Sequence, residues 1–440
     1  MLMLALLAGL AVEPQVASTP GNVLLVMADD VGCDMVSLFS GHPDAPPTPT
    51  LDALAASGVS FQAAYTDPVC SPTRACVLTG RYSFRTGIGN FLFPSGAPQP
   101  SLQPAEVTIP EAIDAFAPWT FDSSAVGKWH LTAPPFNVSL APNLQGFGWF
   151  EGTAGNLYIG QNYYNHTTIR NGVALTSTTY STTEQVNAAL KRSREMREPW
   201  FMYLAFNAAH DPWHIPPASL HTYALSGAPA ASPPVHYRAS VQALDSELGR
   251  LFAGMDPGVR ARTTVIFLSD NGSPNEVVSA PAVSGRAKGT LFEGGVRVPL
   301  IISGPTVAHP GSQCHALVNS VDLFPTVMEL CGVSAVSQST LRRIDGISLT
   351  PYLAQPWRPP LREWVFATKF LPNGFGPYTS LGRMIRNARW KLIERMGQSD
   401  QFFDMASPQG EDVNLALGSL DTAQRAAYAR LATQLRELVP

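Results

Sequence analysis

The residues best suited to chemistry in this chain lie in one short segment that joins a thiol to a guanidinium. Cys70-Ser71-Pro72-Thr73-Arg74 places a nucleophilic side chain and a permanent positive charge about one helical turn apart. Pro72 favours the start of a helix, where backbone N–H groups face an anion, and Leu78-Thr79-Gly80-Arg81 marks the helix end. The segment predicts a nucleophile held against an anionic group, with the pKa of the Cys70 thiol lowered.

Four polar clusters, each after a short apolar run, supply further reactive side chains. They are Asp29-Asp30 after Asn22–Ala28, Lys128-Trp129-His130 after Ala125-Val126, His210 after Trp200–Phe206, and Asp270-Asn271 after Thr263–Leu268. Near-continuous apolar runs are typical of buried parallel strands. Because ligand sites in open α/β sheets lie beyond the carboxyl ends of the strands, we expect these clusters to converge on one crevice.

The acidic clusters predict a site for a divalent cation. Asp29, Asp30, Asp270 and Asn271 offer only oxygen atoms, a set that suits one Ca²⁺ ion better than Mg²⁺. Three carboxylates brought together without a cation repel one another strongly. The alternative is that Asp29 or Asp270 only caps a helix or closes a turn. A thiolate at position 70 is too soft a ligand for such a hard ion.

The elements that must position these residues follow the pattern of an α/β protein. Leu300–Ser303 is a further strand, and helical spacing predicts helices over Val241–Phe252 and Asp322–Cys331. We therefore expect a large, mainly parallel mixed sheet sandwiched by helices. From about residue 346 the pattern changes to a smaller antiparallel sheet and a helix. The expected elements there are Trp364–Thr368, Met384–Arg386, Arg389–Glu394, Gln401–Asp404 and the helix Thr422–Leu438.

Composition and the N-terminus bear on the class of protein. The chain has 440 residues, 45% of them apolar, and a formal net charge of −4, which argues against nucleic acid as a partner. Met1–Ala11 is apolar but too short to cross a bilayer, and it predicts a signal peptide over residues 1–17 and export. No later run is long and apolar enough for a membrane span. The expected units are residues 18–345, which carry the site, and residues 346–440.

Cysteines and glycosylation sequons follow from the expectation of export. If Cys70 is chemical, Cys33, Cys76, Cys314 and Cys331 allow three disulfide pairings, among which the sequence does not choose. Asn137 and Asn165 lie in sequons that can carry glycans, which makes a glycoprotein the expectation for a eukaryotic source.

The motifs together resemble the type I sulfatase family, in the alkaline phosphatase superfamily, with an arylsulfatase-like pattern. The signature is Cys70-Ser71-Pro72-Thr73-Arg74 with Leu78-Thr79-Gly80-Arg81, and the likeness runs over nearly the whole chain. The other matching segments are Asp29-Asp30-Val31-Gly32, Thr48-Pro49-Thr50-Leu51-Asp52, Gly127-Lys128-Trp129-His130-Leu131, Ser269-Asp270-Asn271-Gly272, Lys288-Gly289-Thr290-Leu291-Phe292-Glu293-Gly294-Gly295, Asp322-Leu323-Phe324-Pro325-Thr326 and Trp390-Lys391-Leu392.

The resemblance implies a sulfuric ester hydrolase whose cysteine is oxidised to formylglycine by a formylglycine-generating enzyme. It implies that the metal ligands are Asp29, Asp30, Asp270, Asn271 and the modified Cys70. It also implies that sulfate binding and proton transfer fall to Arg74, Lys128, His130, His210 and Lys288, with Lys128, His210 and Lys288 contacting the substrate. His210 with Lys288 then protonates the leaving alcohol, and His130 takes the proton that releases sulfate. The implied substrate is a sulfated small molecule or carbohydrate.

Two departures from the family pattern lie near the expected substrate pocket. Asp211-Pro212 follows His210 where a small polar residue usually precedes the proline, and Gly148 stands at a usually acidic position. Two alternatives to a sulfatase stay open at this stage. One is a phosphonate monoester or phosphodiester hydrolase of the same superfamily, and the other is a non-catalytic binder of sulfated glycans whose Cys70 stays a thiol.

Overall fold

A computed structural model describes residues 20–40, 44–93, 99–158, 160–278, 283–334 and 344–439. The predicted signal peptide over residues 1–17 lies outside this range. Within it, an 11-stranded mixed sheet forms the centre of the molecule. The strands run in the spatial order β11 (Ser312–Asn319), β2 (Gly58–Tyr65), β10 (Leu300–Ser303), β8 (Thr263–Ser269), β1 (Asn22–Ala28), β7 (Trp200–Ala205), β3 (Asp122–Gly127), β4 (Trp149–Gly152), β5 (His166–Arg170) and β6 (Val173–Ser177), and β9 (Arg297–Val298) pairs with β2.

The central strands of this sheet are parallel, and antiparallel pairs lie on either side of them. β8, β1, β7, β3 and β4 are successive parallel neighbours, whereas β10, β5 and β6 run antiparallel to theirs. The expected α/β class is therefore confirmed. Every residue of β1 is buried, which explains why its sequence is almost continuously apolar.

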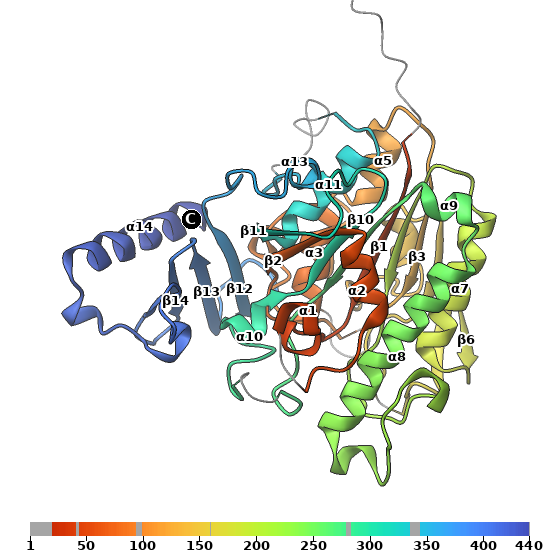
Figure 1. Cartoon of the computed structure of the whole chain (residues 1–440), viewed down its shortest axis with the longest axis horizontal. Coiled ribbons are helices and arrows are strands. Elements are labelled where there is room, and N and C mark those ends of the chain that lie inside the picture. Colours follow the sequence, from red (N-terminus) through yellow and green to blue (C-terminus); the bar gives the residue numbers. More distant parts are fainter. Residues whose placement is uncertain are drawn as a thin grey trace, which may run out of the picture.

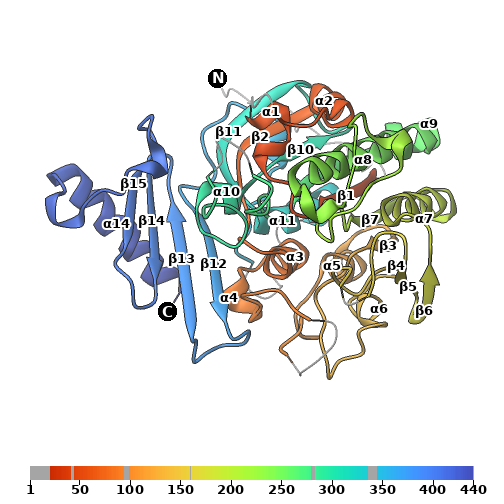
Figure 2. The ribbon, with the colours of Figure 1, turned by 90° about the horizontal axis from the view of Figure 1, so that it is seen from below.

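Helices cover both faces of the sheet, as Figure 2 shows. Val23, Leu25 and Met27 of β1 pack on the side of α3 (Cys70–Thr79), α5 (Ile109–Phe116), α11 (Leu323–Leu330) and α13 (Thr350–Ala354). The alternate residues of β1 pack on the side of α2 (Pro49–Ala56), α7 (Ser181–Glu195) and α8 (Pro233–Gly254). This alternation follows from the two-residue period of a strand, and it makes the sheet the middle layer of three.

The last part of the chain forms a second, smaller sheet at one end of the molecule, drawn in blue in Figure 1. Its antiparallel order is β12 (Val365–Leu371), β13 (Ser380–Arg386), β14 (Trp390–Arg395) and β15 (Gln401–Asp404). The helix α14 spans Thr422–Leu438, as predicted, and buries Leu431 and Leu435 against this sheet. Residues of α13 pack in the core of the large sheet, so the first part of the segment 346–440 lies against the larger unit.

Short elements connect these layers. They are α1 (Ser37–Ser40), α4 (Ser83–Thr86), α6 (Ala141–Leu144), α9 (Pro257–Ala261), α10 (Glu293–Val296), and the 3₁₀ turns Cys33–Met35, Ala218–Leu220, Pro229–Ala231, Ser320–Asp322, Gly410–Asp412 and Leu417–Ser419. In the described ranges, no helix combines the length and the apolar character that crossing a bilayer requires. All five cysteines are described, and none of them forms a disulfide.

Candidate active site

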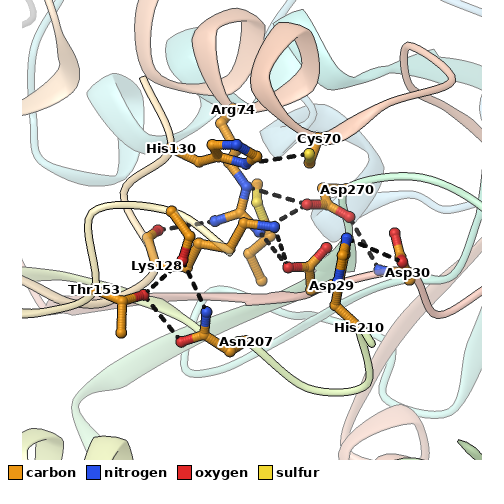
Figure 3. A network of polar contacts seen from close by, with 12 residues as sticks. Asp29, Asp30, Cys70, Arg74, Lys128, His130, Thr153, Asn207, His210 and Asp270 are labelled. Atoms are coloured by element: carbon orange, nitrogen blue, oxygen red, sulfur yellow. Dashed lines mark hydrogen bonds and ion pairs between the residues drawn. The ribbon is translucent and has the colours of Figure 1, made fainter. Parts of the chain in front are cut away.

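The structure gathers the ten predicted site residues at one edge of the large sheet, and Figure 3 labels eight of them. Asp29-Asp30, Lys128-Trp129-His130, His210 and Asp270-Asn271 follow β1, β3, β7 and β8, which are neighbours in the order β8-β1-β7-β3. These strands are parallel, so their carboxyl ends meet at the same edge. The expected convergence on one region is therefore confirmed.

Cys70 is the first residue of α3, and His130 is its closest polar neighbour. The Sγ atom lies 3.2 Å from Nδ1 of His130, and both side chains are buried. Nε2 of His130 donates to the carbonyl of Leu92 at 2.6 Å, because a carbonyl can only accept. A neutral His130 therefore presents an unprotonated Nδ1 to position 70. Burial, with the charges of Lys128 and Arg74, holds the pKa of His130 well below its usual value and keeps it neutral.

The expected lowering of the Cys70 pKa is wrong. Burial raises the pKa of this thiol above its ordinary value, and the nearby positive charge of Lys128 does not offset the loss of solvation. The negative charges of Asp29 and Asp270 act in the same direction as burial. An unmodified Cys70 is thus a neutral thiol at neutral pH, which makes it a weak nucleophile.

The oxygens expected to hold a metal are fully buried, and two of them lack a hydrogen-bond partner among the described residues. These are Oδ1 of Asp29 and Oδ1 of Asn271. Asp29, Asp30 and His210 each place one potential ligand atom within 4.8 Å of the others. Burial and the charge of Asp29 raise the pKa of Asp270 although Arg74 contacts it, which indicates excess negative charge. The donor set fits a hard divalent cation.

Each of the three predicted carboxylate ligands contacts at least one predicted cation, and Asp29 also lies 3.7 Å from the guanidinium of Arg74. Lys128 pairs with Asp29, Nζ of Lys288 lies 2.6 Å from Oδ2 of Asp30, and the guanidinium of Arg74 donates to Oδ2 of Asp270 at 2.7 and 3.0 Å. Burial lowers the pKa of Lys288, but the Asp30 carboxylate outweighs this and raises it above the ordinary value. Lys288 therefore stays charged, as does Arg74, since burial lowers the pKa of its guanidinium but the neighbouring carboxylates outweigh this and raise it.

Asp270 and Asn271 also hold the two strand ends together. Oδ1 of Asp270 accepts the backbone N–H of Asp30 at 3.1 Å, and Nδ2 of Asn271 donates to Oδ1 of Asp30 at 2.7 Å. Asp270 therefore does have the turn-closing role considered as an alternative, while Oδ1 of Asn271 has no hydrogen-bond partner among the described residues. Asp270 can accept the backbone N–H and also bind a metal ion, since a carboxylate has several lone pairs.

His210 faces the acidic residues with one ring nitrogen and Asp211 with the other. Its Nδ1 lies 2.7 Å from the Asp211 carbonyl and 2.9 Å from Oδ1 of Asp211, so that nitrogen carries a proton. Nε2 lies 3.7 Å from Oδ2 of Asp30 and 3.3 Å from the Tyr158 hydroxyl. Burial raises the pKa of Asp211, but the hydrogen bond with His210 and the charge of Lys288 bring it below its ordinary value. Asp211, noted as a departure from the pattern, is therefore a partner of a site residue.

Sequence reasoning missed Tyr158, Asn207 and the carbonyl of Leu92. Tyr158 approaches His210 from a loop without a motif, and Oδ1 of Asn207 accepts from the Thr153 hydroxyl at 3.1 Å behind Lys128 (Figure 3). Asn207 lies two residues after β7, in the same position relative to its strand as the other clusters, and this spacing was the one available signal. Nothing in the sequence marked Tyr158 or Leu92.

Two site residues adopt a left-handed backbone. Asp30 has φ 65° and His130 has φ 59°, both directly after a strand. Non-glycine residues rarely adopt this conformation, which costs on the order of 1 kcal/mol and is found more often at functional sites than elsewhere.

Comparison with known proteins agrees with this geometry. The family model described as Sulfatase matches residues 21–333. Human arylsulfatase A is 33% identical over 83% of this chain and 73% of its own length, and pig N-acetylgalactosamine-6-sulfatase is 31% identical over 77% and 67%. The solved structure of Ps i-CgsB with a neocarrahexaose has a TM-score of 0.79 at 24% identity, covering 95% of this chain and 92% of that one. The putative sulfatase yidJ from Bacteroides fragilis has a TM-score of 0.77 at 17% identity, covering 97% and 98%, and these two likenesses show the fold.

Proposed function

Because this chain belongs to the sulfatase family and is a sulfuric ester hydrolase, we propose that its nucleophile forms at Cys70 by oxidation to formylglycine. The observation that carries this proposal is the pairing of Cys70 with an unprotonated nitrogen of His130 at a helix N-terminus. The raised pKa of the thiol supports it as well, since the unmodified side chain is poorly suited to attack. An aldehyde hydrate at this position supplies an oxygen nucleophile and a second hydroxyl.

The cations of the site bind the sulfate group in this proposal. Arg74, Lys128 and Lys288 are cationic side chains near the position of Cys70, so they offset the charge of the ester and the charge that builds up on oxygen during S–O cleavage. All three are held by carboxylates in the structure. A substrate sulfate therefore competes with those carboxylates for the same donors.

A bound divalent cation would engage these carboxylates and leave the lysine and arginine donors to the sulfate. We infer that this ion is Ca²⁺. Asp29, Asp30, Asp270 and Asn271 are the residues that would hold it, with the modified residue 70 completing the set. When bound, the ion supplies positive charge to the nucleophile and to the sulfate oxygens. The two unpartnered buried oxygens of Asp29 and Asn271 support this, because buried acceptors without donors are costly unless a cation meets them.

Two histidines move the protons. His210, assisted by Lys288, donates from Nε2 to the oxygen of the departing alcohol, and this donation requires the doubly protonated ring because the proton on Nδ1 is held by Asp211. Nδ1 of His130 takes a proton from the group at position 70 as sulfate leaves. Burial suits this role, because the low pKa of His130 keeps Nδ1 available as an acceptor.

The expectations about processing belong to the same proposal. A signal peptide over residues 1–17 directs export, and a formylglycine-generating enzyme oxidises Cys70 during maturation. Residues 18–345 form the catalytic unit, and residues 346–440 cover one end of it. The names of the relatives, an arylsulfatase and an amino-sugar sulfatase, support a sulfated small molecule or carbohydrate as the substrate.

Mass spectrometry of the peptide that contains Cys70, combined with kinetics, tests the nucleophile. We expect the mature protein to carry an aldehyde in place of the thiol, and Cys70→Ala to lose at least about 10³-fold in turnover with its fold intact. Cys76→Ala, a buried cysteine of the same helix, is the matched control and keeps its activity. An unmodified thiol in an active preparation contradicts the proposal. Faster turnover of a phosphodiester than of the paired sulfate ester would instead assign the chain to the phosphonate or phosphodiester alternative.

A further inference from the structure

A cavity of about 460 Å³ opens beside the catalytic residues, and its walls carry no permanent charge. Its aromatic and aliphatic wall includes Phe91, Phe93, Leu157, Tyr158, Ile169 and Ala174. The polar side chains that complete the described wall include His130, Thr153 and Asn156, and no described lining residue is a lysine, an arginine, an aspartate or a glutamate.

The cavity shares His130 with the proposed reaction site. His130 contacts Cys70 with Nδ1 and also lines the cavity, and its partner Leu92 is part of the same wall. Tyr158 contacts Nε2 of His210 with its hydroxyl and presents its ring to the cavity. The proposed proton acceptor His130 thus borders the cavity, and the proposed proton donor His210 contacts Tyr158 of its wall. The cavity is therefore in reach of the alcohol part of an ester.

We propose that this cavity binds an uncharged leaving group with an apolar face and rejects esters that carry a second anionic group. The inference rests on the proposed function and names the substrate class for it. Phe91 and Phe93 form an edge-to-face pair with ring centroids 5.1 Å apart, and both are partly exposed at the rim. Such rings pack against a phenol or against the C–H face of a neutral sugar.

The charge around the cavity explains the rejection. The cations of the site are already assigned to one sulfate, and no described lining residue is a lysine or an arginine. Asp211, which contacts Nδ1 of His210, has a partly exposed carboxylate, and the charges of Asp211 and of Lys288 both act on the Tyr158 hydroxyl with opposite sign. A second sulfate or a uronate in the cavity would lose its hydration without meeting a counter-charge among the described lining residues.

Steady-state kinetics on a matched pair of sugars tests the specificity. N-acetylglucosamine 6-sulfate carries a neutral acetyl group on the nitrogen where glucosamine N,6-disulfate carries a second sulfate. We expect kcat/KM to be roughly tenfold or more higher for the N-acetylated sugar. 4-Nitrophenyl sulfate is the third substrate, and its kcat/KM shows whether phenols or sugars are preferred among neutral leaving groups. Equal or faster turnover of the disulfate overturns the proposal.

Two lysine variants test whether the cavity wall sets that ratio. Ala174 lines the cavity and is exposed, whereas its neighbour Val173 points to the opposite face of the same strand. We expect Ala174→Lys to shift the ratio about fivefold or more toward the disulfate and Val173→Lys to leave it unchanged. The same ratio in both variants refutes the assignment of this wall.

Truncation of one ring separates this proposal from the proposed function. Phe93→Ala is expected to lower kcat/KM for 4-nitrophenyl sulfate about fivefold and to leave the inhibition constant of inorganic sulfate unchanged, because sulfate carries no leaving group. Binding of 4-nitrophenol by calorimetry measures the cavity without turnover. If the protein hydrolyses no sulfate ester but binds the phenol through Phe93, the result contradicts the proposed function and supports the proposed binding cavity. If it hydrolyses esters and Phe93→Ala changes neither measurement, the result contradicts the binding cavity and supports the proposed function.

Discussion

Single residues of the site neutralise one another, three cations against three carboxylates. Lys128 and Lys288 each contact one carboxylate and Arg74 contacts two, and the carboxylates come from the ends of two neighbouring strands. Buried charges persist only where they are paired or meet a metal, so removal of one partner leaves the other exposed to the full cost of desolvation. When a metal ion and a sulfate bind, the carboxylates can contact the metal ion and the lysines and the arginine can contact the sulfate.

Asp29→Asn tests the metal-binding residues. The substitution keeps the volume, removes one negative charge and leaves Lys128 without its partner. We expect the dissociation constant of Ca²⁺ to rise by roughly tenfold or more and turnover to fall with it. Calorimetric titration and the metal content after dialysis measure the effect. Asp52→Asn, on the exposed side of α2, is the control, and equal metal content in both variants contradicts the ligand assignment.

Asp67 makes the stability of the protein depend on pH. Burial raises the pKa of its carboxyl to about 6, although the N–H of Thr368 donates to it at 2.8 Å. A folded-state pKa above the unfolded value means that this group contributes stability below about pH 4, which is lost as the pH rises through about 6. Asp67→Asn removes this pH-dependent contribution to stability and keeps an acceptor for the backbone N–H of Thr368.

Chemical unfolding at a series of pH values measures the effect of Asp67. We expect the free energy of unfolding of Asp67→Asn, relative to the unsubstituted protein, to rise by about 2 kcal/mol between pH 4 and pH 7 and to level off above that. The relative value isolates Asp67 because the other titrating groups are common to both proteins. A constant difference over this range shows that the carboxyl titrates normally.

At the scale of elements, the placement of α3 decides where Cys70 lies. The helix is buried along its whole length, and Gly80 ends it with φ 68°. A Cβ on Gly80 would lie 2.9 Å from side-chain atoms of both Phe324 and Ile344, so the chain approaches too closely for any other residue. The sequence pattern predicted this helix end, because glycine after a helix favours the left-handed conformation.

Gly80→Ala measures this constraint. We expect a loss of about 2 to 3 kcal/mol in the free energy of unfolding, from the left-handed backbone and from the contact with Phe324. Gly397→Ala is the control, since it has φ 72° and no atom within 4 Å of the added Cβ, and it should lose about 1 kcal/mol. Equal losses in both variants would mean that the packing around α3 relaxes freely.

The bounds of the strands and helices, and the turns after the strands, differ in how well neighbouring residues predict them. The bounds predicted for β1, β10 and α14 agree with the structure, because a buried strand and an amphipathic helix are read from neighbouring residues. The left-handed turns at Asp30 and His130 were not predicted, since a side chain with a Cβ rarely adopts that conformation. Packing of the following loop imposes them.

At the scale of the whole molecule, Lys391 joins the small sheet to the large unit. It is fully buried in β14, and its Nζ lies 2.9 Å from Glu293 of α10 and 2.7 Å from Glu411. Glu293 also contacts Arg386 of β13 at 2.7 Å. Figure 1 places β13 and β12 beside α10, so this cluster lies where the two units meet.

Lys391→Met tests the connection. The variant leaves Glu411 without its lysine in a buried position, and we expect the free energy of unfolding to fall by about 3 kcal/mol. Lys191→Met, on an exposed lysine of α7, should change it by less than about 0.5 kcal/mol. Adding Glu411→Gln to Lys391→Met should recover part of the loss. No recovery in the double variant contradicts the role of the ion pair.

The sequence alone was sufficient for the fold class, the order of the motifs and the convergence of four polar clusters. Each of these follows from a local property: a buried strand is apolar, and the residues directly after neighbouring parallel strands meet at one edge. The tertiary structure was needed for the partners. Arg74 and Asp270 are 196 residues apart, and Lys288 and Asp30 are 258 apart, so no local pattern relates them.

The chemical state of Cys70 and the character of the cavity also depended on the tertiary structure. Burial raised a pKa that the helix start alone would have lowered, because the loss of solvation outweighed the nearby positive charge. The cavity gathers Phe91, Tyr158 and Ala174 from three separate segments, none of which carries a motif. Desolvation and cavity shape depend on everything that surrounds a group, so they are decided only when the whole chain is packed.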